Sequence, residues 1–161
     1  MKGVPGIMKN DIMLEKFKKL YHTEKRSIIA QLGTPVISFQ TLTVYSRNQM
    51  WLVLHFQEQN LNGELHSLLD AVTFYDKNMR LLWSDGLRLF PLDFKDHLPQ
   101  TVGELLNQHG EPHCQIGSGK TVLLYLAETG QIIFMNIEGE RITDACPVNL
   151  SELAGKFNIH T

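Results

Sequence analysis

One short pattern occurs twice in this chain and limits its fold more than any other feature: a helical segment ends in Gly-x-Pro and gives way to strand-like alternation. The two copies are QLGTP at 31–35 and QHGEP at 108–112. Glycine adopts the backbone conformation that ends a helix, and a proline just beyond it prevents the helix from continuing. Because the same order of elements recurs about half a chain apart, the sequence predicts two tandem units.

The helices are predicted from apolar residues at helical spacing and from the capping residues that precede them. Four segments fit, at 11–20, 23–32, 101–109 and 151–157. Thr23 and Thr101 are the expected N-caps of the second and third segments, and Glu104 stands at the capping-box position after Thr101. Each unit therefore begins with helix.

Alternation of apolar and polar residues predicts the strands that follow each helix. In the first unit they lie at 42–45, 50–56, in a long segment ending with 71–75, and at 80–83; in the second unit they lie at 114–116, 121–127, 131–137 and 141–144. Asn62-Gly63 is typical of a type I′ hairpin turn, which favours an antiparallel meander. We expect an α+β fold with units at 1–90 and 91–161, joined by a connector at 91–99 that holds one helical turn, or merged into one continuous curved sheet with helices on its outer side.

A helix that ends in LGxP, precedes a four-stranded antiparallel meander and is repeated at this spacing resembles the β-lactamase inhibitory protein fold. That fold is similar to the small lipoproteins of the outer-membrane barrel-assembly machinery. The resemblance covers most of residues 11–144. It implies a non-enzymatic binding module, and no individual inhibitory residue can be carried over from it.

The composition is that of an ordinary globular protein, with 161 residues, 43% of them hydrophobic and 20% charged. No run of about 18 apolar residues is present, so we expect no membrane span. The N-terminus lacks the apolar core of a signal peptide, which predicts a cytoplasmic protein unless a signal has been trimmed. The first 30 residues hold seven Lys or Arg against three Asp or Glu. Without aromatic interleaving, this excess indicates a solvated helix face and no nucleic-acid partner.

The motifs that suggest chemistry do not meet its requirements. In GSGKT at 117–121, the position five residues before Gly119 is Cys114, where a phosphate loop needs glycine, and a strand follows where it needs a helix. Four potential metal ligands, His109, His113, Cys114 and Cys146, lack a recognised ligand spacing, because Gly110 and Pro112 break any helix between the two His. Ser67 lies near His66 and Asp70, but neighbours on a strand point in different directions. We expect no enzyme activity, no cofactor, no metal and two reduced cysteines.

The strands hold the one positive indication of function. If the helices cover one sheet face, alternation places a mostly aromatic set on the other, namely Tyr45, Trp51, Val53, His55, Thr73 and Tyr75. Such a face is either a binding surface for a protein partner or a face that the two units bury against each other.

We therefore expect a protein–protein recognition module, as a monomer or a homodimer, whose partner the sequence does not identify. Two alternatives remain. One is a small-molecule or lipid pocket between sheet and helices, which requires a large apolar cavity. The other is a dimer similar to the bacterial secretion chaperones, which binds an extended partner segment. A flat aromatic face, a closed cavity and a large symmetric interface distinguish the three.

Overall fold

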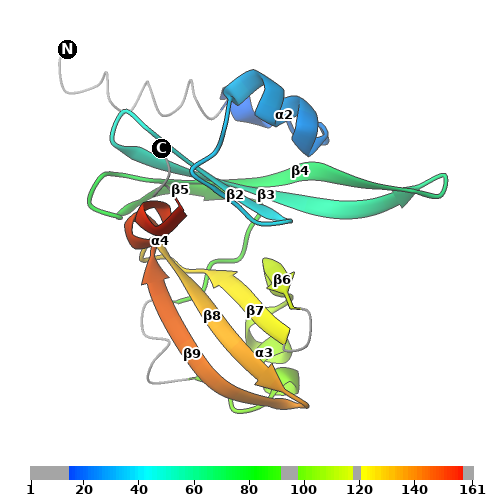
Figure 1. Cartoon of the computed structure of the whole chain (residues 1–161), viewed down its shortest axis with the longest axis vertical. Coiled ribbons are helices and arrows are strands. Elements are labelled where there is room, and N and C mark those ends of the chain that lie inside the picture. Colours follow the sequence, from blue (N-terminus) through cyan, green and yellow to red (C-terminus); the bar gives the residue numbers. More distant parts are fainter. Residues whose placement is uncertain (1–14, 92–97, 118–120, 158–161) are drawn as a thin grey trace.

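Figure 1 shows the computed structural model of the chain, which describes residues 15–91, 98–117 and 121–157. Of the helix predicted at 11–20, only the end falls among these residues, and residues 15–18 are helical. The single helical turn expected within the connector falls on residues 92–97, outside the described part of the chain.

After the helical residues 15–18, the described part of the first half contains the helix α2 and a five-stranded antiparallel sheet in which each strand pairs with the next. Its elements are α2 (Lys25–Leu32), β1 (Ile37–Ser38), β2 (Leu42–Arg47), β3 (Met50–Leu61), β4 (Glu64–Tyr75) and β5 (Leu81–Asp85). All four predicted strands are confirmed. The two-residue strand β1 was not predicted, and β3 runs to the Asn62-Gly63 turn.

The second half contains a helix, a four-stranded antiparallel sheet and a further helix. Its elements are α3 (Val102–His109), β6 (Cys114–Ile116), β7 (Thr121–Leu126), β8 (Gln131–Glu138), β9 (Arg141–Asn149) and α4 (Leu150–Phe157). Every predicted strand is present, and β9 extends five residues beyond the predicted end at residue 144. The α+β class is confirmed, with antiparallel sheets as its main component. The expectation that the sheets merge into one is wrong, because β5 and β6 are not neighbours in any sheet.

The helices α2 and α3 end at the glycines predicted from the sequence, and one of their two predicted N-caps is confirmed. The hydroxyl of Thr101 accepts a hydrogen bond from the Glu104 N–H, so the predicted cap is confirmed. Thr23 is not a cap, because Glu24 occupies the N-cap position of α2 and makes no side-chain cap bond. Gly33 and Gly110 end their helices at φ +93° and +79°, where only glycine is unstrained.

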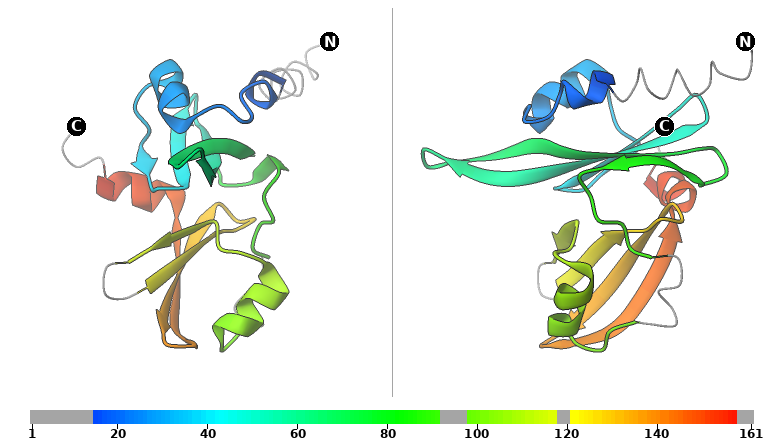
Figure 2. Two further views of the ribbon diagram at one scale, coloured as in Figure 1. Left: turned by 90° about the vertical axis from the view of Figure 1, so that its right-hand side faces the viewer. Right: turned by 180° about the vertical axis from the view of Figure 1, so that it is seen from behind.

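Three buried clusters divide the molecule into layers. One cluster joins α2 to the upper face of the first sheet, and another joins α3 to the outer face of the second. The third, called here the inter-sheet core, lies between the two sheets and beside α4 (Figures 1 and 2). Its buried members are Ile37, Leu42, Val44, Val53, Tyr75, Cys114, Leu124, Leu126, Ile132, Leu150, Leu153 and Ala154. The order of layers is therefore helix, sheet, sheet, helix.

A two-stranded arm extends the β3–β4 hairpin well past the rest of the first sheet (Figure 1). We define the arm as residues 57–67, in which β3 and β4 pair only with each other. At its base, Asp70 is an extra residue in β4, because His55 pairs with Ala71 while Phe56 pairs with Leu69. Such a bulge increases the local twist and lets the arm diverge from the sheet.

Candidate functional site

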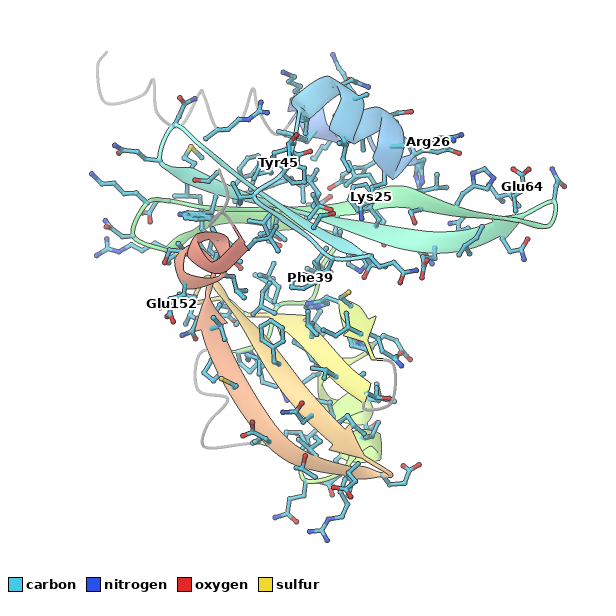
Figure 3. All side chains as sticks on the ribbon, viewed as in Figure 1. Lys25, Arg26, Phe39, Tyr45, Glu64 and Glu152 are labelled. Atoms are coloured by element: carbon cyan, nitrogen blue, oxygen red, sulfur yellow. The ribbon has the colours of Figure 1, made fainter. Side chains whose placement is uncertain are left out.

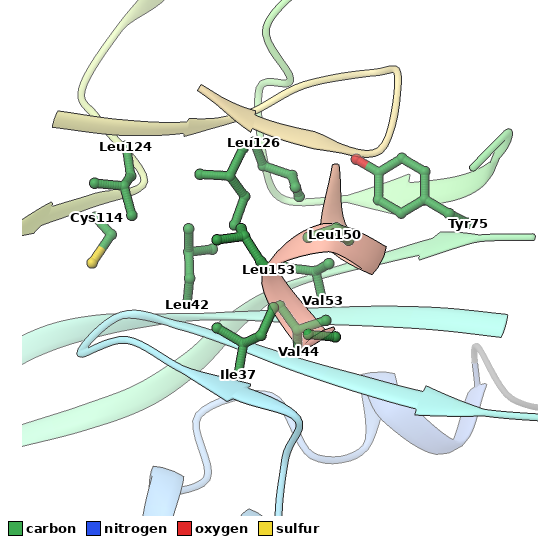
Figure 4. Close-up of a cluster of buried hydrophobic side chains, with 12 residues drawn as sticks. Ile37, Leu42, Val44, Val53, Tyr75, Cys114, Leu124, Leu126, Leu150 and Leu153 are labelled. Carbon is green, nitrogen blue, oxygen red and sulfur yellow. The ribbon is translucent and has the colours of Figure 1, made fainter. Parts of the chain in front are cut away.

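The face predicted as an aromatic binding surface is mostly covered by the second sheet. Val53 and Tyr75 are exposed by 1% and 0% and belong to the inter-sheet core (Figure 4). Thr73 is also buried, and its hydroxyl is hydrogen-bonded to that of Ser84. The expectation of an open binding surface is therefore corrected. These side chains are buried by packing between the two sheets, which was the alternative use of this face.

Tyr45 lies on the opposite face from the one predicted. Val44 pairs with Val53, and Tyr45 pairs with Leu52, so Tyr45 faces α2 together with Leu52 and Phe74. The two-residue Asn48-Gln49 turn, with φ of 54° and 64°, fixes this register. Alternation within a strand identifies two faces, but the turn decides which of them matches the face of the next strand.

Trp51 and His55 remain partly exposed at the sheet junction. Trp51 packs against the inter-sheet core. His55 contacts the Asp70 carboxylate through Nδ1 at 2.6 Å, and its ring lies edge-on to that of His113 at 6.2 Å. The sequence grouped His55 with aromatic contacts for a partner, whereas its contacts are within the chain.

His113 joins the second sheet to the segment that precedes it. Its Nδ1 accepts the Leu126 N–H at 2.7 Å, so Nε2 carries the proton and donates to the Arg88 carbonyl at 2.9 Å. Burial, and to a lesser degree nearby His55, lowers the pKa of His113 to about 3. With both ring nitrogens engaged, a neutral His113 holds structure together and has no lone pair left for a metal.

The other residues with suggestive chemistry do not converge. His66 contacts Glu24 while Asp70 contacts His55, so Ser67 has no catalytic partners from this local cluster. Cys114 is buried and Cys146 exposed, and both are free thiols. Within the described residues, no three His, Cys, Asp or Glu side chains are grouped as metal ligands require. Residues 118–120 of the GSGKT string lie outside the described part.

A groove of about 370 Å³ lies between α2 and the outer strand of the arm. Its walls are the start of α2, with Lys25 and Arg26, and the arm residues from Glu64 to Ser67, two sides that Figure 3 labels. The Glu24 carboxylate contacts His66 and accepts a hydrogen bond from Arg26, and these two contacts, that of His66 first, lower the pKa of the Glu24 carboxyl. Leu65, 66% exposed, supplies apolar surface together with Ile29.

The floor of this groove is an open strand edge. The outer edge of β4 is covered by β5 as far as Val72, and Leu69 exchanges main-chain hydrogen bonds with His22 and Thr23. Every second residue of a strand directs its N–H and C=O to the same side. Ser67 and Leu65 therefore also direct theirs outward, and no described residue bonds to them.

A second cavity, of about 220 Å³, lies on the α2 side of the first sheet. Apolar and aromatic side chains form most of its lining, namely Phe17, Leu32, Tyr45, Met50, Leu52 and Phe74. Lys16 and Arg47 line it as well, and the Arg47 guanidinium lies over the Tyr45 ring at 5.5 Å. The Tyr45 hydroxyl donates to the Gly33 carbonyl at 2.9 Å, and burial raises the pKa of Tyr45.

Comparison with known proteins gives no further assignment: no protein-family model, curated protein or solved structure matches the chain. Among the described helices, none has the length and apolar character needed to cross a membrane.

Reasoning from sequence missed the groove. A pocket between sheet and helices was one of its alternatives, but it did not predict which residues line this cavity. The arm had a detectable signal, because the interval from Phe56 to Ala71 around Asn62-Gly63 exceeds what a short hairpin loop needs. The cavity had none, since it depends on where the end of the first helix packs against the sheet.

Proposed function

We propose that this chain is a non-enzymatic protein-recognition module that binds an extended segment of a partner protein along the outer edge of β4. The observation that carries the proposal is the open edge itself. Two outward N–H and C=O pairs, at Leu65 and Ser67, line the floor of a groove whose far wall is α2. An added strand satisfies such groups and gains affinity from the main chain, whatever its sequence.

The side chains around the edge supply the selectivity. A partner strand continues the line of residues 22–24, which already pair with β4 before the chain turns into α2. Its apolar side chain contacts Leu65 and Ile29, and its polar groups face the Glu24, Arg26 and His66 cluster. The burial of Leu65 by a partner removes one of the largest exposed apolar side chains of the described residues.

This proposal keeps the recognition function expected from the sequence and moves it to a different surface. The aromatic face contributes stability through the inter-sheet core, and the partner contact lies on the arm. An extended bound segment is also what the chaperone-like alternative requires, so the two differ in oligomeric state. We propose a monomeric module, and a stable symmetric dimer in sedimentation analysis favours the alternative.

We further propose that the halves are tandem copies of one unit, in line with the resemblance to the β-lactamase inhibitory protein fold. Matching hydrogen bonds support this relation. The Tyr45 hydroxyl donates to the carbonyl of Gly33, and the Tyr125 hydroxyl donates to that of Gly110. The N–H groups of Val36 and His113 donate to the carbonyls of Val44 and Leu124, at equivalent places after each helix.

The test uses extended peptides selected from a random display library against the wild-type protein. Ser67→Pro removes an outward N–H of β4, and by the same alternation it spares the hydrogen bonds to β3. We expect the selected peptides to bind Ser67→Pro at least about tenfold more weakly than the wild type. The variant loses the hydrogen bond from the Ser67 N–H to the peptide and weakens the adjacent strand pairing.

Glu58→Pro is the matched control, because it removes an outward N–H from the other edge of the same arm. Peptide affinity for this variant, measured by calorimetry, should equal that of the wild type. Unchanged binding to Ser67→Pro, with a native circular dichroism spectrum, contradicts the proposal, as does failure of the library to yield any extended binder.

A further inference from the structure

The cavity on the α2 side of the first sheet differs from the same place in the second half of the chain. There Tyr125, which donates to its helix-end glycine as Tyr45 does, is covered by Phe90. The Phe90 ring meets the Tyr125 ring edge-on at 5.3 Å and stacks on His109 at 4.1 Å. An aromatic side chain thus occupies the space between helix, sheet and tyrosine in the second half.

In the first half, the described residues leave a cavity beside the corresponding tyrosine. Leu32, the last residue of α2, stands where His109, the last residue of α3, stands in the second half. It lines the cavity of about 220 Å³ beside Tyr45, and the ring of Phe17 packs on Phe74 at 5.7 Å. The remaining volume is of the order of one aromatic ring with a short chain. Since protein interiors are normally close-packed, an unfilled apolar space between helix and sheet suits a ligand.

The charged residues around the cavity favour a negatively charged ligand. Lys16 and Arg47 line it, and none of the nine described residues of its lining is acidic. Within the described residues neither cation lies within ion-pair distance of a carboxylate. The Arg47 guanidinium lies over the Tyr45 ring, which places its charge beside the aromatic part of the cavity lining.

We propose that this cavity binds a small carboxylate with an aromatic ring on a short alkyl chain, in the class of 3-phenylpropionate. The ring occupies the space between Leu32, Tyr45 and Phe74, in the manner of Phe90 in the second half. The carboxylate pairs with Arg47 and Lys16 at the rim. This site lies on a different part of the first sheet from the β4 edge, and it does not depend on the peptide-binding proposal.

The test titrates the full-length protein with 3-phenylpropionate and, separately, with the uncharged 3-phenylpropan-1-ol. We expect saturable binding of the carboxylate in calorimetry, with amide shift changes at Tyr45, Met50 and Phe74. The alcohol should bind about tenfold more weakly, because it cannot form the charge-assisted pairs with Arg47 and Lys16 at the exposed rim. Arg47→Gln should weaken the carboxylate by a similar factor and leave the alcohol unchanged.

Two further variants complete the design. Lys19→Gln removes a neighbouring charge that does not line the cavity, and it should bind both compounds as the wild type does. Leu32→Trp fills the cavity and should abolish binding of both, with Met50→Phe as a milder filling variant. The proposal is overturned if neither compound binds saturably, if acid and alcohol bind equally, if Lys19→Gln and Arg47→Gln have the same effect, or if a folded filling variant retains full affinity.

Discussion

At the scale of the residue, two buried threonines, one in each of the strands that flank β3, differ in one respect that decides their contribution to stability. Thr43 and Thr73 are exposed by 0% and 1%. The Thr73 hydroxyl has Ser84 as its partner at 2.8 Å, whereas the Thr43 hydroxyl has none among the described residues. A buried hydroxyl without a partner has lost its water without compensation.

Thr43→Val should therefore raise the free energy of unfolding by about 1 kcal/mol, because valine keeps the shape and removes the unsatisfied group. Thr73→Val is the matched control and should lower it by about 1 kcal/mol, since Ser84 then loses its partner. Urea unfolding of both variants measures whether each substitution raises or lowers the free energy of unfolding. Destabilisation by Thr43→Val equal to that by Thr73→Val would show that the Thr43 hydroxyl is satisfied in solution.

His113 gives the protein a pH-dependent stability. Its pKa is about 3 in the folded chain, against 6.5 for free histidine. Between these values the unfolded chain binds one more proton than the folded chain, so acidification favours unfolding. We expect His113 to lower the free energy of unfolding by about 1.4 kcal/mol for each pH unit below about 6, until the folded pKa is reached.

His113→Asn tests this expectation, because the amide oxygen replaces Nδ1 as acceptor for the Leu126 N–H without a titrating group. The variant should be less stable at neutral pH but should lose most of this slope. Denaturant unfolding at several pH values between about 4 and 7 provides the measurement. A slope unchanged from the wild type would mean that His113 is protonated in the fold.

At the scale of the element, the sequence predicts what local chemistry controls and misses what register controls. Helix ends at Gly33 and Gly110, and the cap at Thr101, follow from residue type alone. The prediction for the face of Tyr45 is wrong because that face depends on the Asn48-Gln49 turn, in which Gln49 is an unusual residue for a left-handed position. The open edge of β4 depends on where residues 22–24 stop pairing with it, a tertiary contact without a local signal.

Two glycines that follow strands have nearly the same φ and different surroundings. Gly63, at φ +87°, has open space where a Cβ would lie. Gly86, at φ +86°, would place a Cβ 2.4 Å from the Asp70 carbonyl oxygen, at the bulge. Gly63→Ala should cost about 1 kcal/mol from the left-handed backbone alone. Gly86→Ala should cost clearly more, because strand β5 must move.

Thermal melts of the two alanine variants compare these costs directly. A Gly86→Ala variant as stable as Gly63→Ala would show that β5 shifts away from the bulge without loss of packing. The comparison isolates the steric effect, since both substitutions place the same residue at the same φ.

At the scale of the whole molecule, the units expected at 1–90 and 91–161 are not independent in their packing. Val44 and Val53 from the first sheet and Leu124 and Leu126 from the second share one buried cluster (Figure 4). The Tyr75 hydroxyl also donates to the Ala127 carbonyl across the junction at 2.6 Å. From the sequence, the alternating face could be either a binding surface or a face buried between the two units. Strand alternation does not distinguish these, because it does not show what covers a face.

Separated halves should therefore not fold stably. Expressed alone, 1–90 and 91–161 should each bind a hydrophobic dye and lack a cooperative melt, because each exposes its half of the inter-sheet core. The intact chain should unfold in a single transition. Either half folding cooperatively by itself would show that its own helix–sheet core is sufficient.

The positions of the two cysteines make separation of the sheets chemically visible. Cys114 lies in the inter-sheet core, and Cys146 lies exposed on β9. A thiol reagent should modify the exposed Cys146 at once and reach Cys114 only when the junction between the sheets opens. In a Cys146→Ser protein, Cys114 is the only thiol left, so the rate of modification reports this opening. The rate at which its remaining thiol reacts, compared with the rate of global unfolding, measures how often the two halves part while each stays folded. A rate as fast as that of Cys146 would contradict the burial of Cys114.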